Sequence, residues 1–335
     1  WLRAVYGSGR ATPEDVVREL IRRAEADAEL NVWITPPRME RIRPYLDRLR
    51  SVPPSDLPLW GVPFAIKDNI DCSGVPTTVG CPDYQYLPTE NAAVVERLIA
   101  AGAIPLGKTN LDQFATGLVG VRSPYGETHN AWKEELISGG SSSGSAVAVA
   151  RGQAAFALGT DTAGSGRVPA ALNGIVGWKP SLGAWPNKGV VPASASLDCV
   201  TVFAHDLEDA LTVDRAVRGR DAEDPWSRDV AHVRAAKPNA LLVPKGPLAF
   251  FGPYGKCYQQ AWERAVKRLN GLGVACETID TGMFSEAAAL LYDGPYVDER
   301  WASLGSFVET HPGSALPVTE RILRSGQAAN YSGTD

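Results

Sequence analysis

The sequence is poor in cysteine and histidine, with five scattered cysteines and four histidines among 335 residues. None of the cysteines forms a Cys-x-x-Cys pair, so the pattern does not predict a zinc site, and we expect free thiols in a reducing cytoplasm. The cysteines are Cys72, Cys81, Cys199, Cys257 and Cys276. We expect neither a metal nor a cofactor.

Long apolar runs and an excess of positive charge are also lacking. No run reaches the roughly 18 apolar residues that a membrane-spanning helix needs, and residues 1–4 have no apolar signal core. The formal net charge is −5, which argues against a protein that coats nucleic acid or an anionic membrane. The sequence therefore predicts neither a nucleic-acid partner nor a membrane partner.

What is present is an ordinary globular composition, with 44% hydrophobic and 21% charged residues. Glycine and proline number 33 and 25, a share below the roughly 25–30% that signals low complexity. At about 150 residues per domain the length allows two domains, although large α/β enzymes often run this long as one.

Apolar periodicity predicts alternating helices and strands. Residues 12–28 have helical spacing and begin with Thr12 as N-cap, Pro13 in the first turn and Asp15 completing a capping box. We expect strands over 59–66, 103–106 and 154–158, and helices over 91–101, 146–150, from 167 onward, 256–272 and 286–304. This alternation favours an α/β architecture.

Two loops rich in glycine and serine stand in the middle of the chain, over residues 138–145 and 159–166. A flexible linker would share this composition, but apolar elements flank both loops closely. Small residues instead allow backbone segments to approach one another.

Three catalytic patterns compete for these segments. Residues 102–109 fit the phosphate loop G-x-x-x-x-G-K-[ST], yet their apolar middle resembles a strand and Pro105 removes one N–H donor. Residues 140–144 fit the G-x-S-x-G elbow, with Ser142 as nucleophile. That elbow needs a strand before it and a histidine after it, and only His205, His232 and His311 follow.

The third pattern uses both loops and needs no histidine. Lys67 follows a buried strand, and Ser141 and Ser165 lie in the two loops. A serine nucleophile needs a base, and a lysine made neutral by burial serves as one. The backbone N–H groups of Thr162, Ala163, Gly164 and Ser165 are candidates for an oxyanion-binding nest. Composition does not decide among the three patterns.

A resemblance does decide. The stretch from Gly61 to Asp209 resembles the amidase signature family, in which Gly-Val-Pro-Phe-Ala-Ile-Lys-Asp-Asn stands here at 61–69 and Gly-Lys-Thr-Asn-Leu-Asp-Gln-Phe-Ala at 107–115. Further matching segments cover 137–146 and 158–170. The resemblance implies a triad of Ser165 as nucleophile, Ser141 with a cis peptide bond as the bridging serine, and Lys67 as the base. It also implies a large mixed β-sheet flanked by helices on both faces.

Within that family the sequence resembles the allophanate hydrolase subgroup over residues 108–126, 159–171, 196–200 and 290–300. The subgroup implies that Tyr292 and Arg300 bind the substrate carboxylate, and that Gly117 contacts the substrate. An arginine fork suits a carboxylate, and a tyrosine hydroxyl adds one donor. From the residues alone, the favoured interpretation is that Arg300 pairs with a neighbouring acid and Tyr292 fills the core; the subgroup match reverses that preference. Arg167 is expected to pair with Asp161 outside the catalytic set.

The implied function is hydrolysis of the terminal amide of allophanate, a small anionic amide, arising from urea carboxylation or from triazine degradation. The alternatives are the glutaminase subunit of a tRNA-dependent amidotransferase, another small-amide amidase, and a non-catalytic scaffold that retains the loops. We expect a cytoplasmic homodimer. We also expect one amidase-signature domain over 1–335, truncated or with gaps after about residue 220. Its N-terminal helical segment covers about 1–50 and its core about 51–335, without a C-terminal accessory domain.

Overall fold

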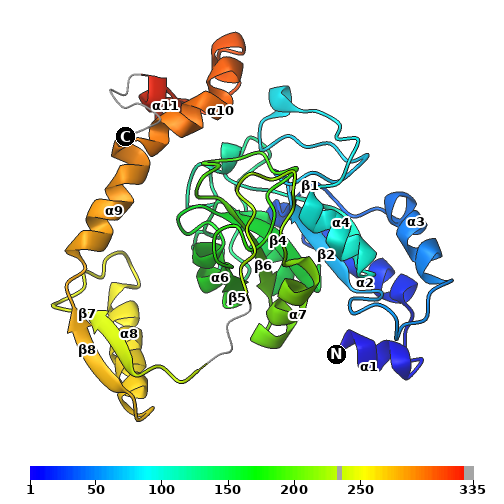
Figure 1. Cartoon of the computed structure of the whole chain (residues 1–335), viewed down its shortest axis with the longest axis horizontal. Helices are drawn as coiled ribbons and strands as arrows, with labels where there is room; N and C mark the ends of the chain where they lie inside the picture. The colour runs from blue at the N-terminus through cyan, green and yellow to red at the C-terminus, as the bar shows by residue number, and fades with distance from the viewer. Residues whose placement is uncertain (232–235, 328–335) are drawn as a thin grey trace. The chain divides into compact units, whose positions relative to one another are not determined.

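The computed structural model describes residues 1–231 and 236–327, without the side chains of residues 292 and 293. The chain divides into two compact units. Unit 1 comprises Trp1–Val230 and Pro295–Asp335, and unit 2 comprises Ala231–Gly294. Figure 1 labels most of the helices and strands of the two units. The division expected near residue 50 stays a prediction.

Unit 1 is built on a six-stranded mixed sheet with the order β1-β3-β2-β4-β6-β5. Strand β2 pairs in parallel with β3 and β4, and the other pairs are antiparallel. The strands are β1 (Trp33–Thr35), β2 (Pro63–Lys67), β3 (Ile104–Thr109), β4 (Phe156–Asp161), β5 (Val176–Trp178) and β6 (Cys199–Ala204).

Helices cover both faces of this sheet, as expected. Successive side chains of a strand point to opposite faces. Phe64 and Ile66 accordingly share one core cluster with α4 (Ala93–Ala100) and α7 (Leu207–Val217). Ala65 belongs to a second cluster with α2 (Pro13–Ala26), α3 (Met39–Leu49) and α5 (Ser143–Ala150). The remaining helices are α1 (Leu2–Gly7), α6 (Arg167–Asn173), α10 (Tyr296–Thr310), α11 (Pro317–Gln327) and the short 3-10 turns Ala28–Leu30, Pro82–Tyr84 and Gln113–Ala115.

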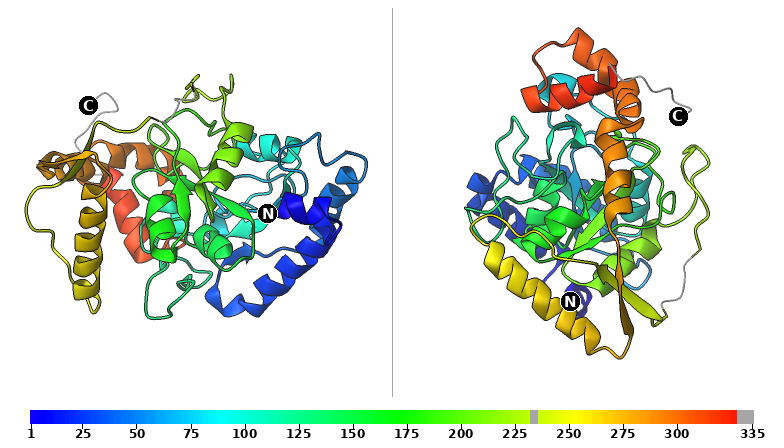
Figure 2. Two further views of the ribbon diagram at one scale, coloured as in Figure 1. Left: turned by 90° about the horizontal axis from the view of Figure 1, so that it is seen from below. Right: turned by 90° about the vertical axis from the view of Figure 1, so that its left-hand side faces the viewer.

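Unit 2 is a small strand–helix–strand arrangement. Its strands β7 (Ala240–Pro244) and β8 (Ala275–Ile279) pair in parallel, and α8 (Gly255–Asn270) connects them. Figure 2 shows α8, in yellow, in two further views. Helix α9 (Gly282–Asp293) follows β8.

Most expected elements form with shifted ends, and two expectations need correction. The helix expected over 286–304 is two helices, because Gly294 and Pro295 separate α9 from α10, and proline cannot donate to a continuing helix. The second glycine-serine loop is shorter than expected, since Gly159, Thr160 and Asp161 extend β4 and pair with β6. The Thr12–Asp15 capping box of α2 is confirmed.

Helix α5 lies close to the backbone of its neighbours because it is built from small residues. A Cβ at Gly144 would lie 2.3 Å from the carbonyl oxygen of Val32 and 2.6 Å from the nitrogen of Asn110. The N–H of Gly144 donates to the carbonyl of Asn110 at 3.0 Å. The first turn of α5 is thereby fixed against the chain that follows β3.

We predict that Gly144→Ala lowers the free energy of unfolding by about 1–3 kcal/mol, the usual cost of overpacking. Gly7→Ala is the matched control, because a Cβ at Gly7 meets nothing within 4 Å. Urea unfolding of both variants measures the difference. Equal midpoints would show that α5 has room to move away from the backbone of residue 32.

Candidate active site

Lys67, the last residue of β2, is the centre of a buried polar cluster. Its side chain is 0% exposed, and Nζ lies 2.7 Å from Ser141 Oγ and 2.7 Å from Thr160 Oγ1. Thr160 reaches this position because β4 lies parallel to β2 in the sheet. The structure therefore brings the expected base and the expected bridging serine into direct hydrogen bonding.

Burial lowers the pKa of Lys67 to about 7, against the opposing attraction of the Asp198, Asp112 and Asp161 carboxylates. A lysine with this pKa is substantially neutral at neutral pH. The neutral amine has a lone pair, which a general base requires.

Ser141 lies in a loop that a buried aspartate holds. The peptide bond between Gly140 and Ser141 is cis. The N–H of Asp112 donates to the carbonyl of Ser141 at 3.0 Å, and a Cβ at Gly140 would lie 2.0 Å from Oδ2 of Asp112. The Asp112 carboxylate also accepts the backbone N–H groups of Val119, Gly120 and Arg122. Asp112 thus ties residues 119–122, which its carboxylate binds, to the Ser141 loop, which its backbone N–H binds.

Ser165 lies between β4 and α6, with 6% of its surface exposed. Its hydroxyl donates to the carbonyl of Gly117 at 3.5 Å, and its own carbonyl accepts the N–H of Ser142 at 3.3 Å. Among the described residues, no hydrogen bond joins the Ser141 and Ser165 hydroxyls. The Ser165 side chain must therefore turn from Gly117 toward Ser141 for a proton relay.

The loop before Ser165 wraps around Asp161. The Asp161 carboxylate accepts the N–H groups of Gly164 at 2.6 Å and Gly166 at 3.1 Å, and Nε of Arg167 at 2.9 Å. The expected pairing of Arg167 with Asp161 is present. Burial alone would raise the pKa of Asp161, but Arg167 and the backbone donors lower it. The carboxylate is therefore an anchor for the loop.

This arrangement removes one of the four backbone donors expected for the oxyanion-binding nest. The N–H of Gly164 is directed at Asp161 and is not open to a substrate oxygen. In the part of the chain that the structure describes, the N–H groups of Ala163 and Ser165 have no acceptor. The hydroxyl of Thr162 donates to Asp198. The Thr162 N–H likewise has no acceptor among the described residues, so Thr162, Ala163 and Ser165 stay as the expected donors and Gly164 is removed.

The structure describes the side chain of only one of the two expected carboxylate-binding residues, Arg300. Arg300, on α10, is 3% exposed and donates to Thr116 Oγ1 at 3.4 Å. Thr116 directly precedes Gly117, whose carbonyl accepts the Ser165 hydroxyl, so Arg300 lies close to the Ser165 loop. Tyr292 lies in α9 of unit 2, and its side chain is outside the described part of the chain.

Among the described residues, the phosphate-loop pattern and the G-x-S-x-G pattern lack the contacts that they require. Gly107 and Lys108 belong to β3, and buried Lys108 pairs with Asp68 at 3.1 Å, so the phosphate-loop interpretation is wrong. Ser142 donates to the carbonyl of Thr160 at 3.1 Å. Neither of the described candidate bases contacts Ser142, since His205 is exposed and His311 binds Thr310 and Phe307. His232 lies outside the described residues.

The sequence interpretation missed the aspartates that support the loops, Asp112 and Asp198, together with Thr160. Burial raises the pKa of Asp198, which accepts the N–H groups of Ala193 at 2.8 Å and Ser194 at 3.2 Å. The three backbone N–H groups that donate to Asp112 lie only 7 to 10 positions further along the chain, so these contacts are local in the sequence. The contact between Asp198 and Thr162 spans 36 residues, and no local sequence pattern indicates it.

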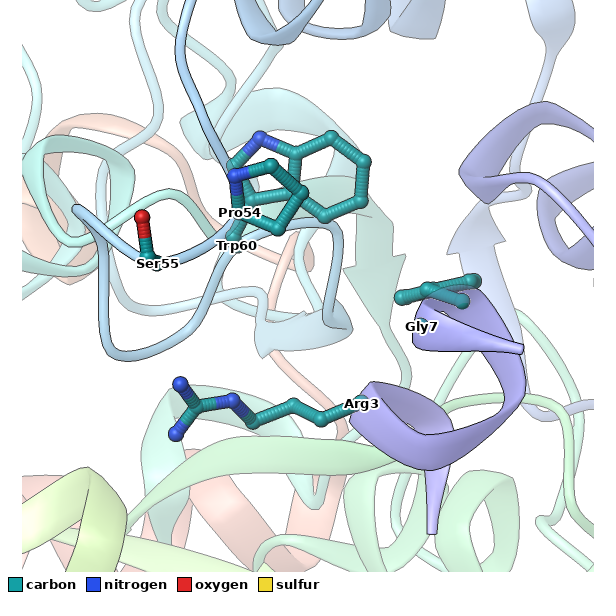
Figure 3. Close-up of a pocket in the computed structure, with 6 residues that line it drawn as sticks. Arg3, Gly7, Pro54, Ser55 and Trp60 are labelled. Atoms are coloured by element: carbon teal, nitrogen blue, oxygen red, sulfur yellow. The ribbon is translucent and has the colours of Figure 1, made fainter. Parts of the chain in front are cut away.

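Other surface features lie apart from these residues. The pocket in Figure 3 is formed by α1 and the loop before β2 and contains none of the predicted site residues. Within residues 1–231 and 236–327, no group of histidine, cysteine and acidic side chains could hold a metal ion, and no helix is long and apolar enough to cross a membrane.

Comparison with known proteins identifies the family. The amidase family model matches residues 15–316. The chain is 46% identical over 313 residues to urea amidolyase of Saccharomyces cerevisiae, covering 91% of this chain and 17% of that protein. It therefore spans about a sixth of that relative's length. It is 41% identical over 244 residues to one subunit of the glutamyl-tRNA(Gln) amidotransferase of Methanosarcina barkeri, covering 70% of this chain and 50% of that protein.

A solved structure agrees with this result. Kluyveromyces lactis allophanate hydrolase superposes with a TM-score of 0.89 at 40% identity, covering 99% of this chain and 55% of that chain. The matched family model covers most of the sequence, including both glycine-serine loops and the strand that ends in Lys67. The chain therefore belongs to the amidase family.

Proposed function

We propose that this chain hydrolyses the terminal amide of allophanate through an acyl-enzyme on Ser165. The observation that carries the proposal is the direct hydrogen bond from buried Lys67 to Ser141, next to the Ser165 loop. Arg300, bonded to the residue before Gly117, supplies a buried cation for the substrate carboxylate. Similarity to urea amidolyase and to allophanate hydrolase supports this substrate.

Acylation begins when Ser165 Oγ attacks the carbonyl carbon of the terminal amide. The Ser165 proton passes to Ser141, and the Ser141 proton passes to neutral Lys67. The N–H groups of Thr162, Ala163 and Ser165 stabilise the oxyanion. The proton returns through Ser141 to the leaving nitrogen, the C–N bond breaks and ammonia departs.

Deacylation reverses the relay. Lys67 and Ser141 take a proton from water, which attacks the Ser165 ester, and the serine leaves with that proton. The released dicarboxylate loses CO2 without help from the enzyme, so one allophanate gives two ammonia and two CO2. The subgroup resemblance adds Tyr292 and Gly117 as contacts of the substrate.

The second candidate is the glutaminase subunit of a tRNA-dependent amidotransferase, because a protein of that kind is 41% identical over 70% of the chain. Ammonia release from allophanate, malonamate, biuret and glutamine separates the two. Preference for glutamine, or activity only with partner subunits present, would favour the amidotransferase. The homodimer and the cytoplasmic location also stand as proposals, which gel filtration and cell fractionation test.

Replacing the nucleophile is the first prediction. We expect Ser165→Ala to lower kcat for allophanate by about 10³-fold or more, since the step that forms the ester is lost. The near-ultraviolet circular dichroism should stay unchanged. Ser55→Ala, an exposed hydroxyl in the loop before β2, is the control with full activity. A rate close to wild type in Ser165→Ala would exclude Ser165 as nucleophile.

The second prediction concerns pH. Neutral Lys67 is the active form, so kcat/KM should rise with pH through the Lys67 pKa of about 7 and level off above it. At pH 6 we expect about a tenth of the plateau value, because one lysine in about ten is then neutral. Lys67→Met should remove activity, while Lys256→Met, exposed on α8, should keep the profile. A flat profile between pH 6 and 8 in the wild type would assign the base to another group.

The third prediction tests carboxylate recognition. Biuret is a neutral analogue of allophanate, with an amide in place of the carboxylate. Arg300→Ala should lower kcat/KM for allophanate by about 10- to 100-fold, the loss of charge-assisted hydrogen bonds, and lower it much less for biuret. Equal losses for both substrates would mean that Arg300 supports the fold only.

A further inference from the structure

The first turn of α10 is held from two sides by adjacent residues. Arg300 donates to Thr116 in the loop that receives the Ser165 hydroxyl. Glu299, the preceding residue, binds a different loop, residues 194–196. Successive residues of a helix point about 100° apart, so one turn reaches both loops.

The Glu299 carboxylate accepts three hydrogen bonds from that loop. Ser194 Oγ and Ser196 Oγ donate to Oε2 at 2.8 and 2.7 Å, and the Ser196 N–H donates to Oε1 at 2.7 Å. Hydrogen bonds to an ionised carboxylate are short and about twice as strong as those between neutral groups. These contacts fix the position and rotation of the first turn of α10 against the loop.

The same loop connects to the segment beside the oxyanion site. The N–H of Ser194 donates to Asp198 at 3.2 Å, while its hydroxyl donates to Glu299. Asp198 in turn accepts the hydroxyl of Thr162, three residues before Ser165. Two carboxylates therefore share Ser194, and through them the first turn of α10 is joined to the loop that carries the nucleophile.

We propose that Glu299 is a positioning residue that sets the distance between Arg300 and Ser165. The enzyme thereby selects amides with a single atom between the carboxylate carbon and the scissile carbonyl carbon. This inference rests on the proposed function, because it assigns the carboxylate to Arg300 and the carbonyl to Ser165. Glu299 itself touches neither group of the substrate and acts through the placement of Arg300.

The test compares substrates of two lengths. Malonamate has one atom between its carboxylate and amide carbons, and succinamate has two. Wild-type enzyme should prefer malonamate, since a single methylene is worth about 10- to 200-fold in kcat/KM. In Glu299→Ala, we expect the ratio of malonamate to succinamate kcat/KM to fall about tenfold, mainly through a higher KM for malonamate. Hydrolysis of biuret, which offers no carboxylate, should stay within about twofold.

Glu309→Ala is the matched control, because Glu309 is exposed on the same helix and bonds to Gln327. It should leave the ratio of the two substrates unchanged. If Glu299→Ala does not fold, Glu299→Gln and Ser196→Ala take its place, since each removes only part of the hydrogen-bond set. Each should lower the ratio about threefold.

The outcomes distinguish a failure of the inference about Glu299 from a failure of the proposed function. An unchanged ratio in the Glu299 and Ser196 variants overturns the inference, as does an equal loss on malonamate, succinamate and biuret. A wild-type enzyme that hydrolyses biuret as well as malonamate overturns the proposed carboxylate recognition instead. A lower ratio with biuret activity kept supports Glu299 as the residue that sets substrate length.

Discussion

The hydrogen bond from Lys67 to Ser141 depends on complete burial of a lysine. An ammonium without water is costly, and the cost lowers the lysine pKa toward neutrality. The sheet provides this burial because Lys67 ends the strand between β3 and β4. Within the described residues, Nζ bonds to two hydroxyls, those of Ser141 and Thr160. Neither hydroxyl carries a charge that would return the lysine to its ammonium form.

Close approach of backbone segments is the second requirement. The loops of Ser141 and Ser165 meet through the hydrogen bond from the Ser142 N–H to the Ser165 carbonyl, and the glycines in these loops and in the adjoining end of β4 leave no room for side chains. A Cβ at Gly159 would lie 2.7 Å from the Ser142 hydroxyl, and one at Gly140 would lie 2.0 Å from Asp112. The glycine and serine content of the middle of the chain thus reflects packing between loops and not flexibility.

The sequence predicted the sheet class and most helices, because each has a local or family-specific pattern. A family pattern also singled out Lys67, Ser141 and Ser165, whose catalytic roles stay predictions. The sequence did not predict the break at Pro295 as a helix boundary, although proline is a local signal, since apolar spacing continues across it. It also did not predict the roles of Asp198 and Glu299. Each binds a partner that is distant in the sequence and lies nearby only in the folded chain. Ser196 and Glu299, for example, are 103 positions apart in the sequence.

Three carboxylates near Lys67 would each stabilise its charged form, yet the effect of burial is larger. The reason lies in how each carboxylate is bound. Asp161 is paired with Arg167, and Asp112 and Asp198 accept backbone N–H groups whose dipoles offset the negative charge. The same hydrogen bonds that hold the three loops in place therefore weaken the field that those acids exert on the lysine. Loop architecture and the proton affinity of the base are in this way two consequences of one set of contacts.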